Sequence, residues 1–353
     1  LIQQEDMVVT VSHRGYIKRV PLSVYRAQRR GGKGRAGMKT RDEDFVTRLF
    51  VTNTHTPILF FTSRGMVYQL KCYTPPEAAP QSLGKAMVNI LPIEPEETIN
   101  TVMPMPEDET SWADLNVMFA TVSGNVRRNN LSDFTNIKRN GKIAMKLQDG
   151  DDLVGVLPCS DEDDVLMATR NGKAIRFAAN AVRVFRGRDS TGVRGIRLLG
   201  GDRVVSMSII VDEDKEFILS VTENGYGKRT PVSDYRRSGR GGQGVANIET
   251  SKRNGQVMAS FAVVEEDQLM LVTNMGQVIR IRVHGGEGDS IRIASRKTQG
   301  VRLFDVADDE SEKVVSAGLV RETDSDDDDD HEEGQEGDNN GDRSVADTGE
   351  TAA

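Results

Sequence analysis

The chain contains 353 residues, with 46 Lys and Arg against 54 Asp and Glu, a net charge of −8 and two cysteines. Two distant cysteines argue against a disulfide-built fold, and no apolar run is long enough to span a bilayer, so a soluble cytoplasmic protein without a membrane partner is expected. The negative charge is concentrated, since residues 321–353 hold 14 acidic and two basic residues and residues 1–320 keep 44 basic against 40 acidic. This asymmetry suggests a polyanionic partner.

One sequence pattern recurs six times along residues 1–320. Each copy has a short apolar run, a Thr or Ser, a two-residue turn ending in Gly, and a second strand with a basic end. The copies occupy residues 9–20, 59–70, 118–129, 166–177, 219–230 and 270–281. Their turn glycines are Gly15, Gly65, Gly124, Gly172, Gly225 and Gly276, spaced about 50 residues apart. Such a period is typical of a propeller-like or solenoid array.

Each repeat is predicted to contain four strands and no long helix. Asn171-Gly172 and Asn224-Gly225 predict type I′ hairpin turns, because both turn positions of that type need a positive φ. The flanking segments alternate and are rich in Val, Ile, Phe and Tyr, as half-buried strands require. A glycine-containing segment and a further apolar strand follow each hairpin.

These features predict an all-β fold, a six-bladed β-pinwheel that forms a propeller-like ring of four-stranded blades over residues 1–320. One blade alone buries too little surface to be stable, so the blades are expected to pack around an axis. The apolar segment 312–320 is expected to complete the first blade and so to remove exposed sheet edges. A pair of β-sandwiches is the alternative, but sandwiches do not repeat six times in register.

Residues 321–353 have few apolar residues and a run of like charges, so they are expected to form a disordered acidic tail. The run of five aspartates in this tail is a candidate regulatory element: Asp326, Asp327, Asp328, Asp329 and Asp330. These carboxylates are expected to compete with a polyanion for the basic rim of the ring. A tail that only aids solubility is the alternative.

Basic residues recur near the end of the second hairpin strand. They are Lys18, Arg19, Arg127, Arg128, Arg176, Lys228, Arg229, Arg280 and Arg282, and the second repeat lacks them. Because the repeats are equivalent, these residues are expected at equivalent places around the ring, where they would form a positive belt along the rim. Such a belt suits a curved polyanion held through its phosphates without reading of sequence. Solvated strand ends are the alternative.

The stretch 27–39 combines glycines with basic residues and contains no acidic residue. Gly32, Gly34 and Gly37 satisfy G-x-G-x-x-G, but a dinucleotide site needs that pattern between a strand and a helix of a βαβ unit. A P-loop would need Lys-Ser or Lys-Thr at its end. Elsewhere the histidines and cysteines lack metal-ligand spacing and no acid and base pair stands out, so no catalytic residue, metal or cofactor is expected.

Glycines in this stretch let backbone N–H groups approach phosphates, and the basic side chains supply charge. The seven residues "QRRGGKG" resemble, at every position, the box of the C-terminal domain of the bacterial DNA gyrase A subunit. The six repeats resemble the β-pinwheel of that family over residues 1 to about 320. The matching positions are Gln28, Arg29, Arg30, Gly31, Gly32, Lys33 and Gly34, with Arg35 adding charge directly after them. A degenerate copy, "RSGRGGQG", stands at residues 237–244.

The resemblance implies a function. In that family the domain wraps double-stranded DNA around its positive rim in a right-handed sense, the box residues are needed for wrapping, and the complete enzyme introduces negative supercoils with ATP. Cleavage with Mg²⁺ belongs to the rest of the gyrase A chain and ATP hydrolysis to the gyrase B chain, in an A2B2 assembly. This domain is therefore expected to be a non-catalytic, monomeric DNA-binding module without cofactors, acting on the bacterial chromosome in the cytoplasm.

Two other interpretations stay open. The C-terminal domain of the topoisomerase IV enzyme shares the hairpin repeat and binds DNA, but it lacks the intact box. A protein-interaction β-propeller would display apolar or mixed-charge loops on one face and would need neither the belt nor the box. Salt-dependent affinity for random duplex DNA separates this last class from the other two.

Overall fold

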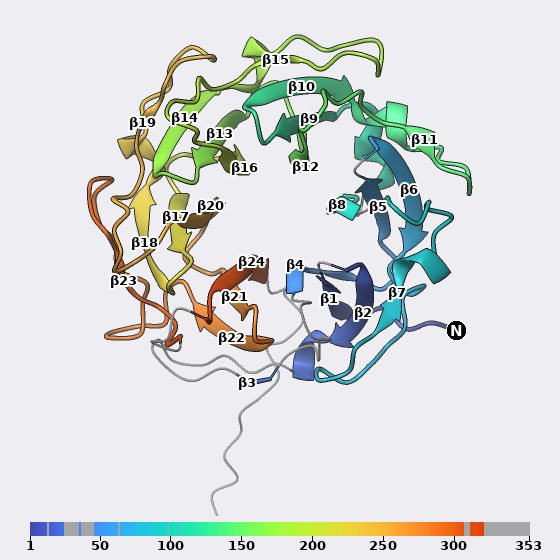
Figure 1. The fold of residues 1–353 in the computed structure, drawn as a ribbon, viewed down its shortest axis with the longest axis horizontal. Helices are drawn as coiled ribbons and strands as arrows, with labels where there is room; N and C mark the ends of the chain where they lie inside the picture. The colour runs from blue at the N-terminus through green and yellow to red at the C-terminus, as the bar shows by residue number, and fades with distance from the viewer. Residues whose placement is uncertain are drawn as a thin grey trace, which may run out of the picture. The chain divides into compact units, whose positions relative to one another are not determined.

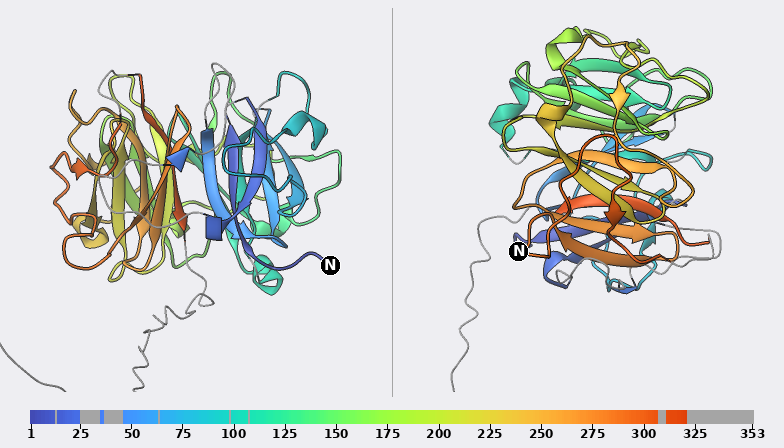
Figure 2. Two further views of the ribbon diagram at one scale, coloured as in Figure 1. Left: turned by 90° about the horizontal axis from the view of Figure 1, so that it is seen from below. Right: turned by 90° about the vertical axis from the view of Figure 1, so that its left-hand side faces the viewer.

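The computed structural model describes residues 1–12, 14–24, 35–36, 46–62, 64–97, 99–106, 108–306 and 311–320. Leu1–Arg321 form one compact unit, in which six four-stranded sheets stand as blades around a central axis (Figure 1). Edge-on views show the strands running between the two faces of this ring (Figure 2). The predicted all-β ring of six blades is confirmed. Box residues 28–34 and the predicted disordered tail, 321–353, lie outside the described residues.

The two central strands of every blade form an antiparallel hairpin. The hairpins pair β1 (Asp6–Ser12) with β2 (Tyr16–Pro21), β5 (Pro57–Thr62) with β6 (Met66–Lys71), β9 (Asn116–Thr121) with β10 (Asn125–Asn130), β13 (Asp164–Thr169) with β14 (Lys173–Ala178), β17 (Phe217–Thr222) with β18 (Tyr226–Pro231), and β21 (Gln268–Thr273) with β22 (Gln277–Arg282). All six copies of the sequence pattern therefore form hairpins, as predicted.

An inner strand and a short outer strand complete each sheet. The inner strands are β4 (Val46–Asn53), β8 (Ile99–Pro104), β12 (Leu153–Cys159), β16 (Val204–Ile210), β20 (Val257–Val263) and β24 (Val314–Val320). The outer strands are β7 (Lys85–Ala86), β11 (Lys142–Ile143), β15 (Val193–Arg194), β19 (Val245–Ala246), β23 (Val301–Arg302) and β3 (Arg35–Ala36). The first sheet, for example, has the order β4-β1-β2-β7.

The hairpin turns differ from the predicted type I′ turns. Three residues, not two, separate β13 from β14, and Gly172 has φ +89° while its N–H donates to the Thr169 carbonyl at 3.1 Å. A three-residue loop with Gly in the left-handed region is also a common hairpin connection. The Thr169 hydroxyl accepts from the backbone N–H of Lys173 at 3.1 Å, which explains why Thr or Ser precedes each turn.

Each outer strand belongs to the next repeat along the chain. Strand β7 follows the second hairpin but pairs with β2 of the first, and the sixth sheet is completed by β3 from the first repeat. The expectation that segment 312–320 completes the first blade is wrong, because β24 pairs with β21 and is the inner strand of the sixth sheet. The ring is therefore closed by a strand of the first repeat, β3, which joins the sixth sheet.

Six apolar clusters fill the seams between neighbouring blades. At the seam between the second and third blades, the rings of Phe61 and Phe119 meet edge to face with centroids 5.7 Å apart. The seam between the sixth and first blades is filled in the same way, by residues such as Val8, Val46 and Val272. Hydrophobic burial at every seam, the sixth–first seam included, thus holds the blades together.

The helical elements are single turns. They are the 3-10 helices η1 (Leu22–Val24), η2 (Met87–Asn89), η3 (Glu109–Ala113), η4 (Leu131–Phe134), η5 (Ala179–Ala181) and η6 (Val232–Asp234). In the part of the chain that the structure describes, no helix is long and apolar enough to span a membrane.

Candidate nucleic-acid interface

The box leads directly into the strand that closes the ring. Gly34, its last residue, precedes Arg35 and Ala36 of β3, whose backbones pair with Val278 and Gln277 of β22. The box residues lie outside the described residues, and only the backbone of Arg35 is described. Since β3 is the outer strand of the sixth sheet, the chain after the box is fixed at the outer edge of the ring.

Five described segments occupy the corresponding place in the other blades. We name these segments crossover loops, because each runs from one hairpin to the outer strand of the preceding blade. They span residues 72–84, 131–141, 179–192, 232–244 and 283–300. The degenerate copy of the box at 237–244 lies in the crossover loop of the fourth blade. In the sequence, the copy thus directly precedes the outer strand β19 as the box directly precedes the outer strand β3.

A glycine precedes every outer strand, and at the five strands where this glycine is described its conformation disfavours other residues. Gly300 has φ +78°, and a Cβ added to it would stand 2.7 Å from the Gly227 carbonyl oxygen. The equivalent glycines, all with positive φ, are Gly84, Gly141, Gly192 and Gly244. Gly34 stands at the same sequence position before β3. At the five described positions the glycine is thus required by its backbone conformation, independent of any ligand.

The predicted belt is largely buried, which corrects the expectation of an exposed rim. Lys18, Arg127 and Lys228 are 0% exposed, and Arg128, Arg176 and Arg229 are also buried. The physical reason is that the second hairpin strand is the third strand of a four-stranded sheet, and loops cover its sides. Arg280 is half-buried, and of the predicted residues with described side chains only Arg282 is exposed.

The buried or half-buried arginines Arg19, Arg128, Arg176 and Arg229 form ion pairs with carboxylates. Their carboxylate partners are Glu77 for Arg19 (3.1 Å), Asp161 for Arg128, Asp164 (2.7 Å) and Glu213 for Arg176, and Glu265 (3.4 Å) for Arg229. In the sixth blade, Arg280 Nε donates to Gln268 Oε1 at 2.5 Å. Buried charges need such partners, so these arginines serve the fold first.

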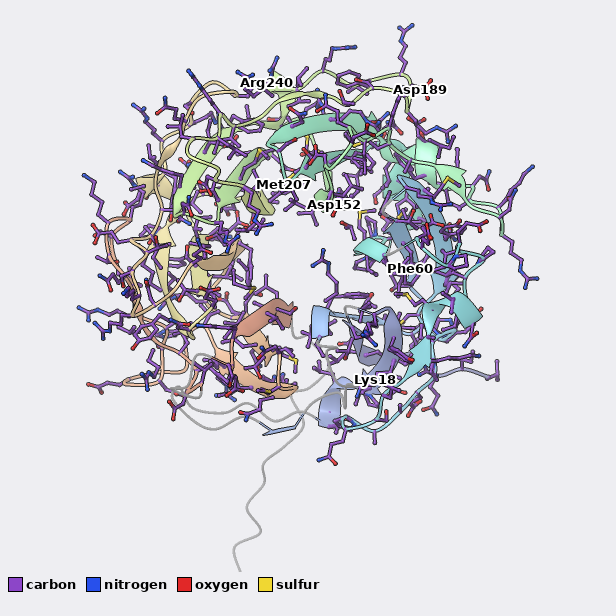
Figure 3. The ribbon with its side chains drawn as sticks, viewed as in Figure 1. Lys18, Phe60, Asp152, Asp189, Met207 and Arg240 are labelled. Carbon is purple, nitrogen blue, oxygen red and sulfur yellow. The ribbon has the colours of Figure 1, made fainter. Side chains whose placement is uncertain are left out.

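Exposed cations lie instead in the outer strands and crossover loops. Lys85 of β7, Arg194 of β15 and Arg302 of β23 are exposed, and Lys142 of β11 is half-buried. Exposed cations of the crossover loops are Lys138, Arg139, Arg183, Arg186, Arg236, Arg237, Arg240, Arg292 and Lys297. Arg240 lies at the outer perimeter of the ring in Figure 3. The predicted belt omits all of these residues. The glycine-containing segments of the repeat pattern contain some of them, namely Lys85, Lys142, Arg194, Lys297 and Arg302.

One face of the ring carries the opposite charge. The connections from each inner strand to the next hairpin lie on this face, because every inner strand ends there. Their exposed acidic residues include Asp161, Glu162, Glu213, Asp214, Glu265 and Glu266, against the single cation Lys215 in connections 160–163, 211–216 and 264–267. Asp161, Glu213 and Glu265 are ion-paired with buried arginines, and the remaining carboxylates make these three connections less favourable for a polyanion than the basic residues of the perimeter.

The box-like copy in the fourth blade shows how such a loop is held. Arg237 contacts Asp164 through two guanidinium nitrogens, at 3.0 and 2.8 Å, and Arg240 donates to the carbonyls of Ala181 and Arg194 at 3.1 Å each. A Cβ added to Gly239 would meet nothing within 4 Å. The loop thus combines anchored arginines with open glycines on the perimeter.

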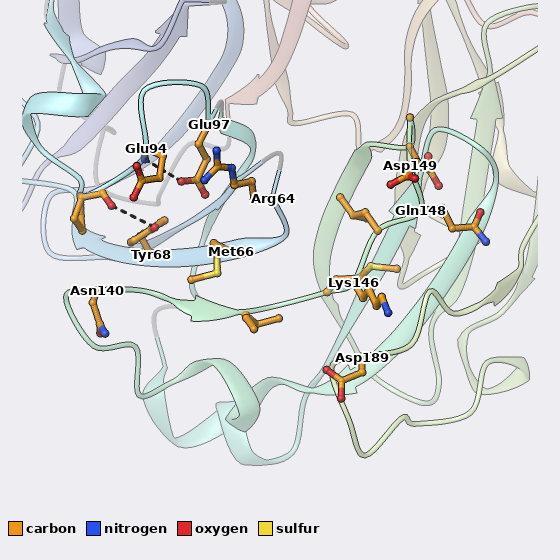
Figure 4. A pocket seen from close by; sticks show the side chains of 16 residues that line it. Arg64, Met66, Tyr68, Glu94, Glu97, Asn140, Lys146, Gln148, Asp149 and Asp189 are labelled. Atoms are coloured by element: carbon orange, nitrogen blue, oxygen red, sulfur yellow. Dashed lines mark hydrogen bonds between the residues drawn. The ribbon is translucent and has the colours of Figure 1, made fainter.

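A hollow between the second and third blades is acidic (Figure 4). Glu94 and Glu97 line one side, Asp149 and Asp189 the other, with Arg64 among them. The Glu97 carboxylate accepts from the backbone N–H of Glu94 at 3.1 Å and from the Thr62 hydroxyl, so it fixes the local turn. With Asp151, five carboxylates line the hollow against two cations, Arg64 and Lys146. This excess of negative charge disfavours phosphate, so the hollow does not extend the candidate interface.

The two cysteines are buried packing residues. Burial raises the pKa of Cys72 to about 11 and that of Cys159 to about 12, so both thiols stay protonated at neutral pH. In the described ranges no group of three or more His, Cys, Asp or Glu side chains could hold a metal ion.

The chain matches the family described as DNA gyrase C-terminal domain, beta-propeller, over residues 6–53, 56–104, 115–160, 163–210, 216–263 and 267–321. The DNA gyrase A protein of Rickettsia bellii is 44% identical over 92% of this chain and 40% of its own length. The Escherichia coli K12 protein of the same name is 46% identical over 88% of this chain and 34% of its own length. The chain thus spans about 40% or less of these relatives.

Solved structures show the same fold. A structure of a DNA gyrase A C-terminal domain superposes with a TM-score of 0.78 at 24% identity, covering 89% of this chain and 99% of its own. A C-terminal domain of DNA topoisomerase IV superposes with a TM-score of 0.65 at 25% identity, covering 91% and 95%. Six matched segments, one for each repeat, cover most of the ring. The chain therefore belongs to the DNA gyrase C-terminal domain, beta-propeller family.

Proposed function

We propose that this domain binds double-stranded DNA without sequence specificity and wraps it in a right-handed sense around the outer perimeter of the ring. The observation that carries the proposal is the position of the box in the chain. The box directly precedes Arg35 and Ala36, the two residues of the outer strand β3. The exposed cations of the crossover loops and outer strands extend from this point around the perimeter.

A distributed interface suits a bent ligand. Bending a site of 20–30 base pairs by 40–90° costs about 1–6 kcal/mol. A single exposed ion pair contributes only about 0–1 kcal/mol, so one blade could not hold the bend. Cations repeated in successive blades can hold the bent DNA, with the box residues Arg29, Arg30 and Lys33 as the strongest anchor. Cations that reach only phosphates position the duplex without reading its bases.

The domain is proposed to act within a larger enzyme. The remaining part of the gyrase A chain and the gyrase B chain, in an A2B2 assembly, would supply DNA cleavage, Mg²⁺ and ATP hydrolysis, and the wrap would direct strand passage toward negative supercoils. The domain itself would be monomeric in isolation, without cofactor or catalysis, and would act on the chromosome in the bacterial cytoplasm. The tail aspartates Asp326–Asp330 are proposed to compete with DNA for the perimeter.

A topoisomerase IV C-terminal domain is the second candidate. The superposition with such a domain, at a TM-score of 0.65, favours it. The intact box at residues 28–34 favours gyrase. The acidic face and basic perimeter give a protein-interaction propeller less support than either.

Linking number distinguishes these functions. Circular DNA is relaxed by a topoisomerase with the domain bound, ligated and analysed for linking number. Positive writhe with the wild-type chain, abolished when Arg29, Arg30 and Lys33 become Ala, supports wrapping anchored by the box. DNA binding without a change in linking number contradicts wrapping and favours the topoisomerase IV type. A chain ending at Val320 that binds DNA at low salt with unchanged affinity rules out competition by the tail.

A further inference from the structure

Three of the six blades hold a cation in the same buried position. Lys18, Arg127 and Lys228 each stand three residues after the hairpin glycine, and each residue is 0% exposed. They share as partners the backbone carbonyls of the crossover loop that covers the same blade. Lys18 Nζ donates to the carbonyls of Ala79 and Ser82, at 3.1 and 3.0 Å, and to that of Pro80.

The other two cations repeat this contact. Arg127 Nη1 donates to the carbonyls of Arg188 and Ser190 at 2.9 and 3.0 Å. Lys228 Nζ donates to the carbonyl of Arg296 at 2.9 Å and to that of Ser295. Within the described residues none of the three cations forms a salt bridge with a carboxylate, so neutral dipoles solvate their charges.

Arg127 and Lys228 hold crossover loops that carry exposed cations, such as Arg186 and Lys297, whereas the loop that Lys18 holds, 72–84, contains no basic residue. Each loop continues through a positive-φ glycine into an outer strand with Lys85, Arg194 or Arg302. A carbonyl bound to a buried cation is turned toward the blade interior. Its partial negative charge is then removed from the outer surface, where it would repel a phosphate, and a full positive charge lies beneath the loop.

We infer that Lys18, Arg127 and Lys228 are positioning residues of the DNA-binding perimeter. They hold the carbonyls of the crossover loops inward, so that the exposed cations of the outer strands, and of the loops over Arg127 and Lys228, face outward. This inference rests on the proposed DNA binding but assigns the three buried cations no contact with DNA. The positioning role is compatible with the burial of Lys18, Arg127 and Lys228, which are among the basic residues that recur in the repeats.

The remaining blades supply an internal contrast. The equivalent residues are Tyr68, Ile175 and Ile279 in the second, fourth and sixth blades. The crossover loop over Ile175 is the box-like copy, and the box itself leads into the strand that pairs beside Ile279. In the fourth blade Arg176, one position later, donates instead to the carbonyls of Val232 and Tyr235 in the crossover loop, at 3.2 and 3.0 Å. The loops over Arg127 and Lys228 also carry exposed arginines, such as Arg186 and Arg292, so the buried cation there adds to the charge of the loop.

The test uses the full chain with Lys228→Met, Lys228→Arg and the control Ile175→Met, which is an apolar change at the same repeat position. Arg is the matched replacement because Arg127 shows that this position accommodates it. Affinity for random duplex DNA is measured at several salt concentrations, thermal unfolding reports stability, and hydrogen exchange follows amides 295–299.

Lys228→Met is expected to weaken DNA affinity about 3- to 10-fold, as the loss of one or two exposed ion pairs would, and to speed exchange at 295–299. Lys228→Arg and Ile175→Met are expected to stay within about twofold of wild type. A folded Lys228→Met that binds DNA as wild type does overturns the inference, and so does an Arg variant that fails as the Met variant does. If Lys228→Met does not fold, the DNA affinity of Lys228→Gln, whose side chain is an uncharged hydrogen-bond donor, is compared with that of wild type. Weaker binding supports the inference, and binding equal to wild type overturns it. A wild-type chain that does not bind DNA contradicts the proposed function itself.

Discussion

Ala36 of β3 is paired with Gln277 of β22, so the first and last repeats are joined by strand pairing at the outer edge of the sixth sheet. Opposed residues of an antiparallel pair lie within the range that a disulfide can span. The double variant Ala36→Cys/Gln277→Cys is therefore expected to form a disulfide on oxidation. The bridge would close a very long loop and raise the free energy of unfolding by up to about 4 kcal/mol.

Mobility on non-reducing gels and denaturant unfolding with and without reductant measure this closure. Cys72 and Cys159 do not compete, because both are buried. Ala36→Cys/Ala246→Cys is the control, since Ala246 belongs to the outer strand of the fourth sheet and should stay reduced. Equal cross-linking in the two double variants would contradict the assigned closure.

The glycine before each outer strand is expected to resist substitution. Gly300→Ala would strain a positive φ and press its Cβ to 2.7 Å from the Gly227 carbonyl oxygen, so the free energy of unfolding should fall by about 1–3 kcal/mol. Gly239→Ala, in an open part of the fourth crossover loop, should change stability by less than about 1 kcal/mol. Urea unfolding of both variants gives the comparison, and equal losses would show that backbone conformation does not decide the effect.

The repeat made the ring predictable, but not its closure. A turn glycine after Thr or Ser, flanked by alternating apolar residues, marks each hairpin, and six equal copies leave few architectures. The outer strands have two residues each, and Arg35-Ala36 shows no periodicity that would identify it as a strand. The partner of β3, β22, is distant in sequence, so no local sequence pattern predicts this pairing between repeats.

The sequence predicts that basic residues form the candidate interface, but it does not predict which basic residues are exposed. Lys18 and Arg19 are adjacent in β2, and alternation along a half-exposed strand predicts that at least one of them faces solvent. In the structure a crossover loop covers Lys18 and Glu77 pairs with Arg19, so neither is freely exposed. Burial by segments from the next repeat is a tertiary effect. The exposed Lys85 and Arg194 stand in the glycine-containing segments that follow each hairpin and could have been found there.

Exposed perimeter cations are expected to set the salt dependence of DNA binding. Each phosphate contact that Lys85→Ala or Arg194→Ala removes should reduce the slope of log K against log salt by about 0.9. Lys215→Ala is the control, because Lys215 is 79% exposed but lies among the acidic residues Asp212 and Asp214. Fluorescence titrations with random duplex DNA from low to moderate salt measure the slopes. If Lys215→Ala changed the slope as much as Arg194→Ala does, binding of DNA along the perimeter would be contradicted.

The buried Lys228 is expected to make DNA affinity depend on pH above neutrality. Burial, together with repulsion from Arg296, lowers the pKa of Lys228 from 10.5 to about 8, while Glu249 and Asp234 oppose this shift. The unfolded chain holds this proton up to a higher pH than the folded chain, so this group makes the folded state more stable as pH rises from about 8 to 10.5. The same deprotonation removes the charge that holds the carbonyls of Ser295 and Arg296, so DNA affinity should fall as pH rises through about 8.

Lys228→Arg keeps its charge over this range and should show a flatter profile of DNA affinity against pH. Binding titrations at constant ionic strength, together with unfolding curves at each pH, measure both effects. The unfolding curves matter because stability and affinity are expected to change in opposite directions, which separates loosening of the crossover loop from loss of the fold. Identical pH profiles for wild type and Lys228→Arg would show that the buried charge does not act on the perimeter.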